Sequence, residues 1–423
     1  MMSCCQSSLK NFRTVWRRFN SCNRIAPRCG SLTLMHTPHV GKKGLCSLSH
    51  RPDASDYRHG RADNIFATDR MLLGNQFVGP NHAKDGDPEA NAGRVMLIDG
   101  TSIIYRAYYK LLAKLHHGHL ANADGNGDWV LTIFTALSLV IDVLEFIPSH
   151  VVVVFDHDGN SFPQSSYPPR QSAAAKGLNF RHTLYPAYKS NRPPTPDTIV
   201  QGLQYLKASI KAMNIRVIEV PGVEADDVIG TLAVRSVEAG FKVRVVSPDK
   251  DFFQILSPSL RLLRIAPRGM DMVSFGMEDF AKKYDNLKPS QFVDVMALVG
   301  DRSDNIPGVE GIGNVHALQL ITKYGSLETL LECVNEVADE RIRNALISNA
   351  DMAILSKNLA LLRSDLPYYM VPFAIDDLLF RGPEDNGEKF TSLLTAMSAY
   401  AEGFSADPII RRAFSLWKKL ERQ

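Results

Sequence analysis

The chain has 423 residues and a mass of 47.0 kDa, and it is 45% apolar and 22% charged, which is typical of globular proteins with one large domain or two. No window approaches the roughly 18 uninterrupted apolar residues of a membrane span, so none is expected. The formal net charge is +3, but residues 1–52 hold nine Lys and Arg and no Asp or Glu, which leaves −6 for the remainder. The pI of about 8.4 therefore reflects this leader.

The leader is rich in Arg and Ser, and aromatic residues alternate with arginines between residues 12 and 19. This pattern predicts an organellar transit peptide over residues 1–60, a linker over residues 61–93, and a location in the mitochondrion or the plastid. A basic tail that contacts nucleic acid is the alternative. Of the six cysteines only Cys333 lies beyond the leader, which excludes a disulfide framework in the folded part and fits a reducing compartment.

Strand-like and helix-like patterns alternate from residue 94 to about residue 300. This βαβ order indicates an α/β fold with a mainly parallel central sheet and flanking helices. A Ser-, Pro- and Ala-rich stretch over residues 157–178 predicts a mobile insertion. The predicted strands are 95–98, 151–155, 216–220, 243–246 and 260–265, and the predicted helices are 101–115, 131–146, 197–213 and one beginning near Ala225.

No strand pattern recurs after Pro289. We therefore expect a catalytic α/β domain over residues 94–300, a helical subdomain over residues 301–370 and a helical C-terminal tail over residues 371–423, in which no motif is recognisable. The helical runs are 291–299, 314–323, 327–334, 351–361 and 391–423.

Nine carboxylates stand in five short clusters, three of which directly follow a predicted strand. Groups at the carboxyl ends of parallel strands converge on one crevice, where like charges raise each other's pKa unless cations neutralise them. Oxygen ligands without His or Cys favour Mg²⁺ or Mn²⁺ over zinc. The nine residues are Asp99, Asp156, Glu224, Asp226, Asp227, Asp249, Asp251, Asp301 and Asp304.

The spacing of these carboxylates predicts two metal ions. The adjacent Asp226 and Asp227 diverge by about 100° on a helix and could face different ions, while Asp301 and Asp304 would share one helical face. Two cations held a few ångströms apart suit hydrolysis of a phosphodiester. Taken singly, each cluster could instead be a helix cap or a turn, but five such clusters together favour the metal site.

A second group combines cations with aromatic rings, in HTLYPAYKSNRPPTP and behind the first strand. Lys and Arg suit phosphates, and tyrosines suit unstacked bases, so the group predicts binding of a nucleic-acid end. A solvated loop whose tyrosines cover the core is the alternative. The members are Tyr105, Arg106, Arg181, Tyr185, Tyr188, Lys189 and Arg192.

A Gly-rich turn, PGVEGIG, lies between two helical runs. Gly308, Gly311 and Gly313 permit a tight turn, and amides at the start of the next helix could bind a DNA phosphate. Alone, such a turn could merely join two helices.

Several long motifs resemble the 5′ nuclease domain of bacterial DNA polymerase I and the phage 5′ exonucleases and flap endonucleases. They are IDGTSIIYRAYY, VVFD, YPAYKSNRPPTP, VEADDVIG, SPDKDFFQIL, LVGDRSDNIPGVEGIG and KYGSLETLL. The resemblance covers roughly residues 94–367. With the leader, the chain resembles a plant-type organellar 5′–3′ exonuclease.

The resemblance implies a PIN-like 5′ nuclease fold with two metal sites, a helical arch, and a helix–three-turn–helix that binds duplex DNA with K⁺. Lys189 and Arg192 would be arch residues acting on the scissile phosphate, and Tyr105 and Arg106 would lie near the entering strand. By position, Asp99, Asp156, Glu224 and Asp226 would serve the first metal, and Asp227, Asp249, Asp251, Asp301 and Asp304 the second, with some shared.

The chain also departs from the family pattern. We expect a stand-alone nuclease, because no polymerase or proofreading domain follows the motifs. The insertion separates Arg181 from Asp156 by an unusual length, which questions the role of that arginine. Glu310 stands where a Lys is common, and residues 314–316 replace a Lys-containing segment, so weaker duplex binding with a flatter salt dependence is expected.

The expected function is a Mg²⁺-dependent 5′–3′ exonuclease or flap endonuclease that acts in organellar DNA replication and repair, including RNA primer removal. Its expected substrate is DNA with 5′ ends, flaps or nicks, and RNA–DNA hybrids and an organellar DNA polymerase are further candidate partners of a monomer. A DNA-structure-binding protein without turnover and an RNA-processing nuclease of the same fold are the alternatives.

Overall fold

The computed structural model describes residues 93–116, 127–157, 179–266, 272–285, 287–401 and 403–422, all within one compact unit, Asn75–Gln423. The predicted transit peptide and linker, and the insertion beyond His157, lie outside the described residues. None of the described helices combines the length and the apolar character that a membrane crossing requires.

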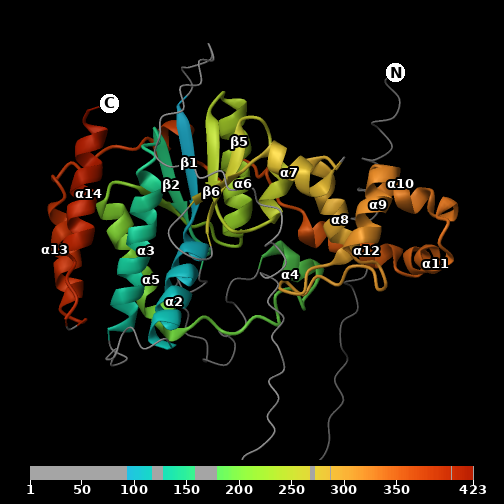
Figure 1. The fold of residues 1–423 in the computed structure, drawn as a ribbon, viewed down its shortest axis with the longest axis horizontal. Helices are drawn as coiled ribbons and strands as arrows, with labels where there is room; N and C mark the ends of the chain where they lie inside the picture. The colour runs from blue at the N-terminus through green and yellow to red at the C-terminus, as the bar shows by residue number, and fades with distance from the viewer. Residues whose placement is uncertain are drawn as a thin grey trace, which may run out of the picture. The chain divides into compact units, whose positions relative to one another are not determined.

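The predicted central sheet is present and has six strands, in the order β3-β2-β1-β4-β5-β6 (Figure 1). The first five strands pair in parallel, and β6 pairs with β5 in antiparallel fashion. The antiparallel edge strand was not predicted from the sequence, because four residues are too few to show a clear alternation. The strands are β1 (Arg94–Asp99), β2 (His150–Val154), β3 (Arg216–Ile218), β4 (Lys242–Val246), β5 (Leu260–Ile265) and β6 (Met272–Phe275).

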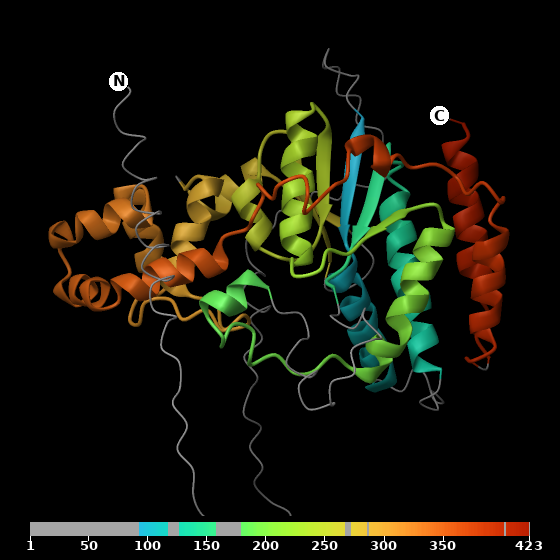
Figure 2. The same cartoon turned by 180° about the vertical axis from the view of Figure 1, so that it is seen from behind.

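The alternation of side chains along the strands builds two separate cores. In β1, Val95 and Leu97 join one cluster of buried residues and Met96 and Ile98 join the other. Helix α6 (Ala225–Glu238) covers the first face, and three helices cover the second (Figures 1 and 2). Those three are α2 (Gly100–His116), α3 (Asp128–Leu144) and α5 (Asp197–Ala212).

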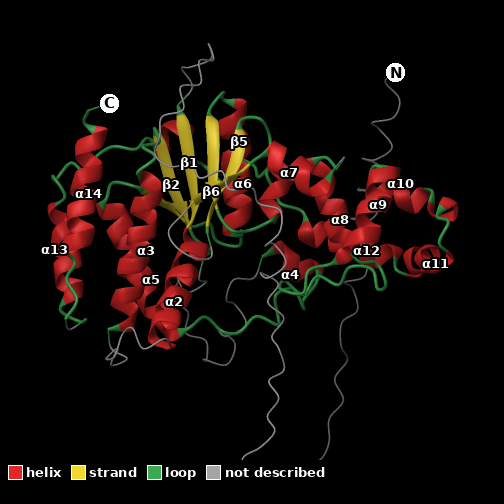
Figure 3. Ribbon diagram, in the orientation of Figure 1, coloured by secondary structure: helices red, strands yellow, loops and turns green. Residues whose placement is uncertain are grey.

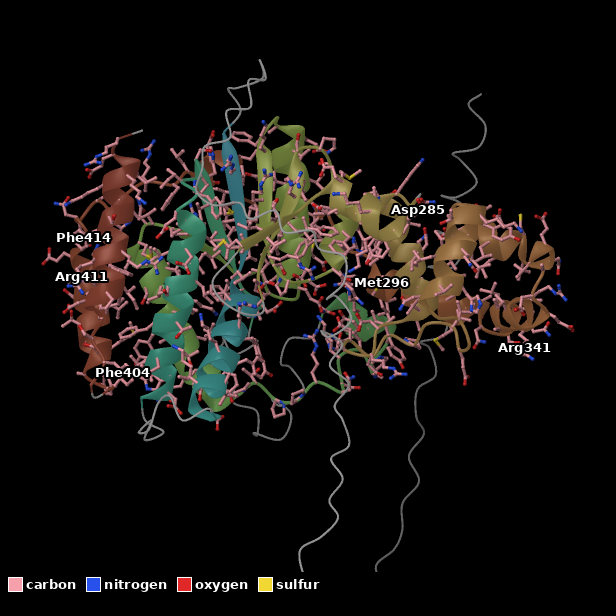
Figure 4. All side chains as sticks on the ribbon, in the orientation of Figure 1. Asp285, Met296, Arg341, Phe404, Arg411 and Phe414 are labelled. Atoms are coloured by element: carbon pink, nitrogen blue, oxygen red, sulfur yellow. The ribbon has the colours of Figure 1, made fainter. Side chains whose placement is uncertain are left out.

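A helical region follows the sheet and shares the core of the α6 face, since the same cluster of buried residues runs from Val95 to Leu378 (Figure 3). Met296 lies inside this region and Arg341 at its outer edge (Figure 4). The helix over residues 340–348 was not predicted from the sequence. The helices are α7 (Met277–Tyr284), α8 (Phe292–Val299), α9 (Asn314–Tyr324), α10 (Leu327–Glu332), α11 (Glu340–Ser348) and α12 (Ala350–Ala360).

Residues 361–380 form a strap that returns from α12 to the sheet. Arg235 of α6 donates hydrogen bonds to the Leu366 and Val371 carbonyls, and Phe380 N donates to Ser149 O at the start of β2. The strap therefore ties the helical region to the sheet.

The C-terminal tail contains α13 (Glu388–Ser398) and α14 (Asp407–Leu420), which confirms helix in the part after residue 387. Residues 371–387 hold no α-helix, contrary to the prediction of a helical tail from residue 371. Leu416 and Trp417 of α14 are buried in the α3 face of the fold, and Arg412 of α14 pairs with Asp142 of α3. Arg411 of the same helix is exposed at the outer side of the molecule (Figure 4), whereas Phe414 is partly buried against Trp417. The tail therefore acts as a further layer over α3.

Candidate active site

Asp99 ends β1 and directly precedes α2, and the residue is 6% exposed. Its Oδ1 accepts a hydrogen bond from Ser102 N at 2.9 Å, and its Oδ2 accepts one from Ser247 Oγ at 2.9 Å. One oxygen thus caps the helix while the carboxylate stays at the carboxyl end of the sheet. The sequence left two roles open for Asp99, a helix cap and a member of the site, and the structure allows both at once.

Asp156 follows β2 in the same way and links that strand to the start of α6. Its Oδ1 accepts a hydrogen bond from Ala225 N at 2.9 Å, and its own amide donates to Thr101 Oγ1 at 3.0 Å. The starts of α2 and α6 therefore meet at this aspartate.

Four aspartates from separate segments face one another at this edge of the sheet. Burial, and then the charge of Asp156, raises the pKa of Asp99 to about 6. The pKa of Asp226 is raised well above its ordinary value by burial and then by the charges of Asp99, Asp249 and Asp156. Ser247 links two of them, since its hydroxyl donates to Asp99 and accepts from the amide of Asp249 at 3.2 Å, and Asp156 binds the amide next to Asp226, so the structure brings the four together.

A second acidic group adjoins the first through Asp249. Asp251 N donates to Asp249 Oδ1 at 2.9 Å, and burial and then the charge of Asp249 raise the pKa of Asp251, to which Asp304 and Asp301 also contribute. The Asp251 Oδ1 atom is buried and has no hydrogen-bond partner. One oxygen of this carboxylate therefore lacks a hydrogen-bond donor among the described residues, while the charge of Lys250 opposes the rise of its pKa.

Asp301 and Asp304 do not lie on a helix, contrary to the sequence prediction. They occupy a turn that a bridge between Asp301 and Ile306 closes, with Ser303 N donating to Asp301 Oδ1 at 2.8 Å. The turn still places both near Asp251, but Asp301 also forms an ion pair with Lys250 Nζ at 3.1 Å.

Side-chain cations from the predicted arch neutralise part of this acidic site. Lys189 Nζ lies 2.9 Å from Glu224 Oε1 and 3.7 Å from Asp304 Oδ2, and Arg192 pairs with Asp304. Burial raises the pKa of Glu224, but the charges of Lys189 and Arg181 outweigh it and the pKa lies below its ordinary value. The arch residues and the carboxylates are thus brought together.

The donor chemistry of this region fits hard divalent cations. The acidic side chains offer only oxygen ligands. Asp226 and Asp251 are each repelled by the charges of neighbouring carboxylates, and the Asp251 Oδ1 atom has no hydrogen-bond partner. Within the described part of the chain, no three His, Cys, Asp or Glu side chains already stand in metal-binding geometry. Lys189, Lys250 and Arg192 provide the positive charge instead.

Asp227 and Arg181, predicted as a metal ligand and a DNA-binding residue, are directed to each other. Arg181 Nη1 and Nη2 donate to the two Asp227 oxygens at 2.7 and 2.8 Å, and both side chains are buried. Arg181 also donates to the Leu359 and Leu361 carbonyls at 2.9 and 2.8 Å. This buried network joins the short segment that holds Arg181 to the end of α12, and it withdraws Asp227 from the four-aspartate group and Arg181 from solvent.

The tyrosines of the arch segment also differ from the sequence prediction. Tyr188 is 3% exposed, and its hydroxyl lies 3.3 Å from both Glu224 Oε2 and Asp304 Oδ2, so its ring cannot stack on a base. Tyr185 is packed against the core. Tyr105 donates to Thr195 Oγ1 at 3.3 Å beyond the arch, and Arg106 donates to the Ala266 carbonyl.

The glycines of the 307–313 turn have two different roles. Gly308 has φ +67°, its amide donates to Ser356 Oγ at 3.0 Å, and a Cβ there would lie 2.5 Å from Gly300 N. Gly311 and Gly313 have open space beside them, and Gly313 precedes α9 as its N-cap. Gly308 therefore serves the packing of the turn, while the other two leave its backbone accessible.

Several site residues were not identified from the sequence. Asn179 donates to Glu224 Oε1 at 2.6 Å, Ser247 donates to Asp99, and Lys250 pairs with Asp301. Only Lys250 had a sequence signal, since a cation between two strand-end aspartates faces strong negative charge. Asn179 and Ser247 are polar residues of a kind that is common in loops.

Comparisons with known proteins show the family of the chain. Residues 171–285 match the family model described as 5′-3′ exonuclease, N-terminal resolvase-like domain, and residues 287–386 match that described as 5′-3′ exonuclease, C-terminal SAM fold. DNA polymerase I of Bacillus caldotenax is 33% identical over 301 residues, which are 71% of this chain and 31% of that protein. The thermostable DNA polymerase I of Thermus filiformis is 35% identical over 281 residues, 66% of this chain and 30% of that protein. The chain thus spans about a third of the length of these relatives.

Solved structures with a similar fold include the T5 D15 protein co-crystallised with metal ions, at a TM-score of 0.48 and 19% identity, covering 73% of this chain and 100% of that one. The catalytic core of Rad2 in complex with DNA substrate has a TM-score of 0.47 and 14% identity, covering 78% of this chain and 93% of that one. On the evidence of the two family models and of the polymerase relatives, the chain belongs to the 5′–3′ exonuclease family.

Proposed function

We propose that the protein is a Mg²⁺-dependent, structure-specific 5′–3′ exonuclease and flap endonuclease that hydrolyses DNA phosphodiesters. The observation that carries this proposal is the convergence of Asp99, Asp156, Asp226 and Asp249 at one edge of the sheet, beside the arch cation Lys189. Carboxylates that repel one another, beside a cation that pairs with Glu224, suit a site that takes up divalent metal and a phosphate together.

The acidic residues divide between two metal positions. Asp99, Asp156 and Asp226, with Glu224, would hold one ion, and Asp251, Asp301 and Asp304 would hold the other, with Asp249 between them; Asp227 is better assigned to Arg181. Bound divalent ions would supply charge neutralisation and a coordinated water of lowered pKa.

The arch residues would recognise the phosphate itself. Lys189 pairs with Glu224, and Arg192 pairs with Asp304. When divalent cations neutralise those carboxylates, the two basic side chains would be free to bind phosphate oxygens. Tyr188 would orient Glu224 and Asp304 through its hydroxyl, because that hydroxyl lies within hydrogen-bond distance of both.

Cleavage of a 5′-labelled flap substrate tests the proposal. Wild-type protein without the leader should release the flap with Mg²⁺ and not with EDTA, and Asp249→Asn should lose at least roughly a hundredfold in rate. The control is Asp365→Asn, since that side chain is 80% exposed on the strap and should leave the rate unchanged. Full cleavage by Asp249→Asn would refute the assignment.

The same assay separates the alternatives. Tight binding of the flap with an intact strand in Mg²⁺ would identify a DNA-structure-binding protein, and preferential cleavage of RNA over DNA flaps in competition would identify an RNA-processing nuclease. Nicked and gapped duplexes in parallel reactions would separate exonuclease from endonuclease action.

The setting is proposed to be the replication and repair of organellar DNA, including removal of RNA primers. It rests on the acid-free, Arg-rich leader over residues 1–60. Fusion of these residues to a fluorescent protein should direct it to mitochondria or plastids, and a cytosolic or nuclear signal would refute the proposal. Light scattering of the leader-free protein should give the mass of a monomer, and mixing with an organellar DNA polymerase would test that partner.

A further inference from the structure

Helix α2 leads away from the acidic site and carries two adjacent stripes that the catalytic assignment does not use. It begins directly after Asp99, and its residues 100–116 contain no Asp or Glu. Tyr105 and Tyr109 lie one turn apart on the first stripe, and Arg106, Lys110 and Lys114 follow at four-residue spacing on the second.

The aromatic stripe is continuous and open at its far end. The rings of Tyr105 and Tyr109 have centroids 6.5 Å apart, and Tyr108 contacts Tyr109 edge-on at 5.4 Å. Tyr105 and Tyr108 are half-buried, whereas Tyr109 is 58% exposed. A ring braced on one side by two others and exposed on the other is a rigid stacking surface.

The cationic stripe is unfavourable for the helix alone. Like charges four residues apart repel, and burial and then the charges of Lys114 and Arg106 lower the pKa of Lys110, opposed by Asp142 of α3. A polyanion laid along the helix would relieve this repulsion. Rings beside cations in parallel rows match the backbone and bases of a single strand.

The stripes are also continuous with the proposed catalytic site. Tyr105 Oη donates to Thr195 Oγ1 at 3.3 Å, just beyond the arch residue Arg192, and the segment between α4 (Phe180–Leu184) and α5 passes beside α2 in both views (Figures 1 and 2). The ten residues from Tyr105 to Lys114 span about 14 Å of helix, enough for at most roughly four nucleotides.

We propose that this face of α2 is a binding track for the single-stranded 5′ segment of the substrate, with a base stacked on Tyr109 and phosphates on Lys110 and Lys114. The proposal rests on the proposed function and adds a subsite to it. It makes the length of the 5′ single strand a determinant of affinity.

Binding of fluorescent duplexes whose 5′ flap grows from none to roughly eight nucleotides tests the track, measured by anisotropy in EDTA so that no strand is cut. For wild-type protein, affinity should rise with flap length and level off near roughly four nucleotides. Tyr109→Ala should bind the long flap roughly fivefold to tenfold more weakly and lose most of this length dependence, while Tyr109→Phe should keep it.

Two further readouts identify the contacts. A 2-aminopurine base in the flap should be quenched by wild-type protein and by Tyr109→Phe but not by Tyr109→Ala. Lys114→Gln should lower the slope of log affinity against log salt for the flap by about 0.7. Tyr369→Ala and Lys389→Gln are the matched controls, since these side chains are 82% and 83% exposed on the strap and on α13.

The outcomes separate the track from the function. If wild-type protein cleaves flaps and Tyr109→Ala shows the same dependence on flap length and the same quenching, the track is refuted and the nuclease remains. If wild-type protein gains no affinity from a flap of any length, the track is also refuted. Absence of cleavage together with a normal Tyr109-dependent gain in binding would refute the nuclease and retain the track.

Discussion

The Lys189 ammonium lies 2.9 Å from Glu224 Oε1, so a residue of the arch neutralises a carboxylate of the proposed metal site. Lys189 also has the left-handed backbone angle φ +54°, and its amide donates to the Asp304 carbonyl at 2.9 Å. The contact is therefore held by the backbone as well as by charge. It suggests that Lys189 and divalent metal compete for the same carboxylates.

Replacing Lys189 by Ala should reveal this competition without any nuclease assay. The metal-free variant should unfold about 1–3 kcal/mol more easily, less than the loss of a whole buried pair because Arg181 still contacts Glu224. Its affinity for Mg²⁺ should rise roughly tenfold, since a cation close to the site is removed. Calorimetric titration of Mg²⁺ measures this, with Lys389→Ala as control; unchanged affinity would refute the competition.

The neighbours Asp226 and Asp227 should respond to the same substitution in opposite ways. Asp226→Asn removes a repelled charge, so the metal-free protein should gain on the order of 1–3 kcal/mol of unfolding free energy. Asp227→Asn leaves the buried Arg181 poorly paired and should cost about 3 kcal/mol. Urea denaturation in EDTA measures both, and each variant serves as the other's control. Equal effects of one sign would contradict the assignment of the two residues.

The stability of the metal-free protein should fall as the pH rises from about 5 to about 7.5. The folded-state pKa of Asp99, about 6, exceeds its ordinary value of 3.8, so this contribution to stability is fully present below pH 3.8 and is lost as the pH rises through about 6. The whole loss, which begins at pH 3.8, is on the order of 3 kcal/mol, and about half of it falls above pH 5; Asp226 and Asp251 act in the same direction.

Urea denaturation in EDTA across this range measures the effect, and Asp99→Asn should reduce the slope. Glu224 and Asp301 have lowered pKa values, so their contributions to stability change only at a pH below the ordinary pKa of a carboxyl group and leave this pH range unaffected. Saturating Mg²⁺ should abolish the fall, because the cations bind the ionised carboxylates. A metal-free protein that becomes more stable toward pH 7.5 would contradict the repulsion among the aspartates.

The two left-handed glycines of the 307–313 turn should differ in their tolerance of alanine. In Gly308→Ala the Cβ would lie 2.5 Å from Gly300 N and 2.6 Å from Val299 C, so the loss should exceed about 3 kcal/mol. In Gly311→Ala, with φ +88° and open space, only the backbone angle opposes the methyl group, and about 1 kcal/mol is expected. Thermal unfolding compares them; equal losses would contradict the packing of the turn.

The sequence alone predicted the parts of this protein that depend on local pattern. Buried β-branched runs such as residues 243–246 must form strands, and parallel strands must bring the residues that follow them, here Asp99, Asp156 and Asp249, to one edge of the sheet. Both statements follow from hydrophobic periodicity and backbone geometry, which neighbouring residues determine.

The tertiary structure decided which polar side chains face that edge. Asp227 is paired with Arg181, 46 residues away, and with the amide of Arg363, 136 residues away, while its neighbour Asp226 faces the acidic group. The hydroxyl of Tyr188 likewise joins Glu224 and Asp304 across the site. A side chain takes the partner that packing brings within hydrogen-bond distance, and no spacing along the chain encodes that distance.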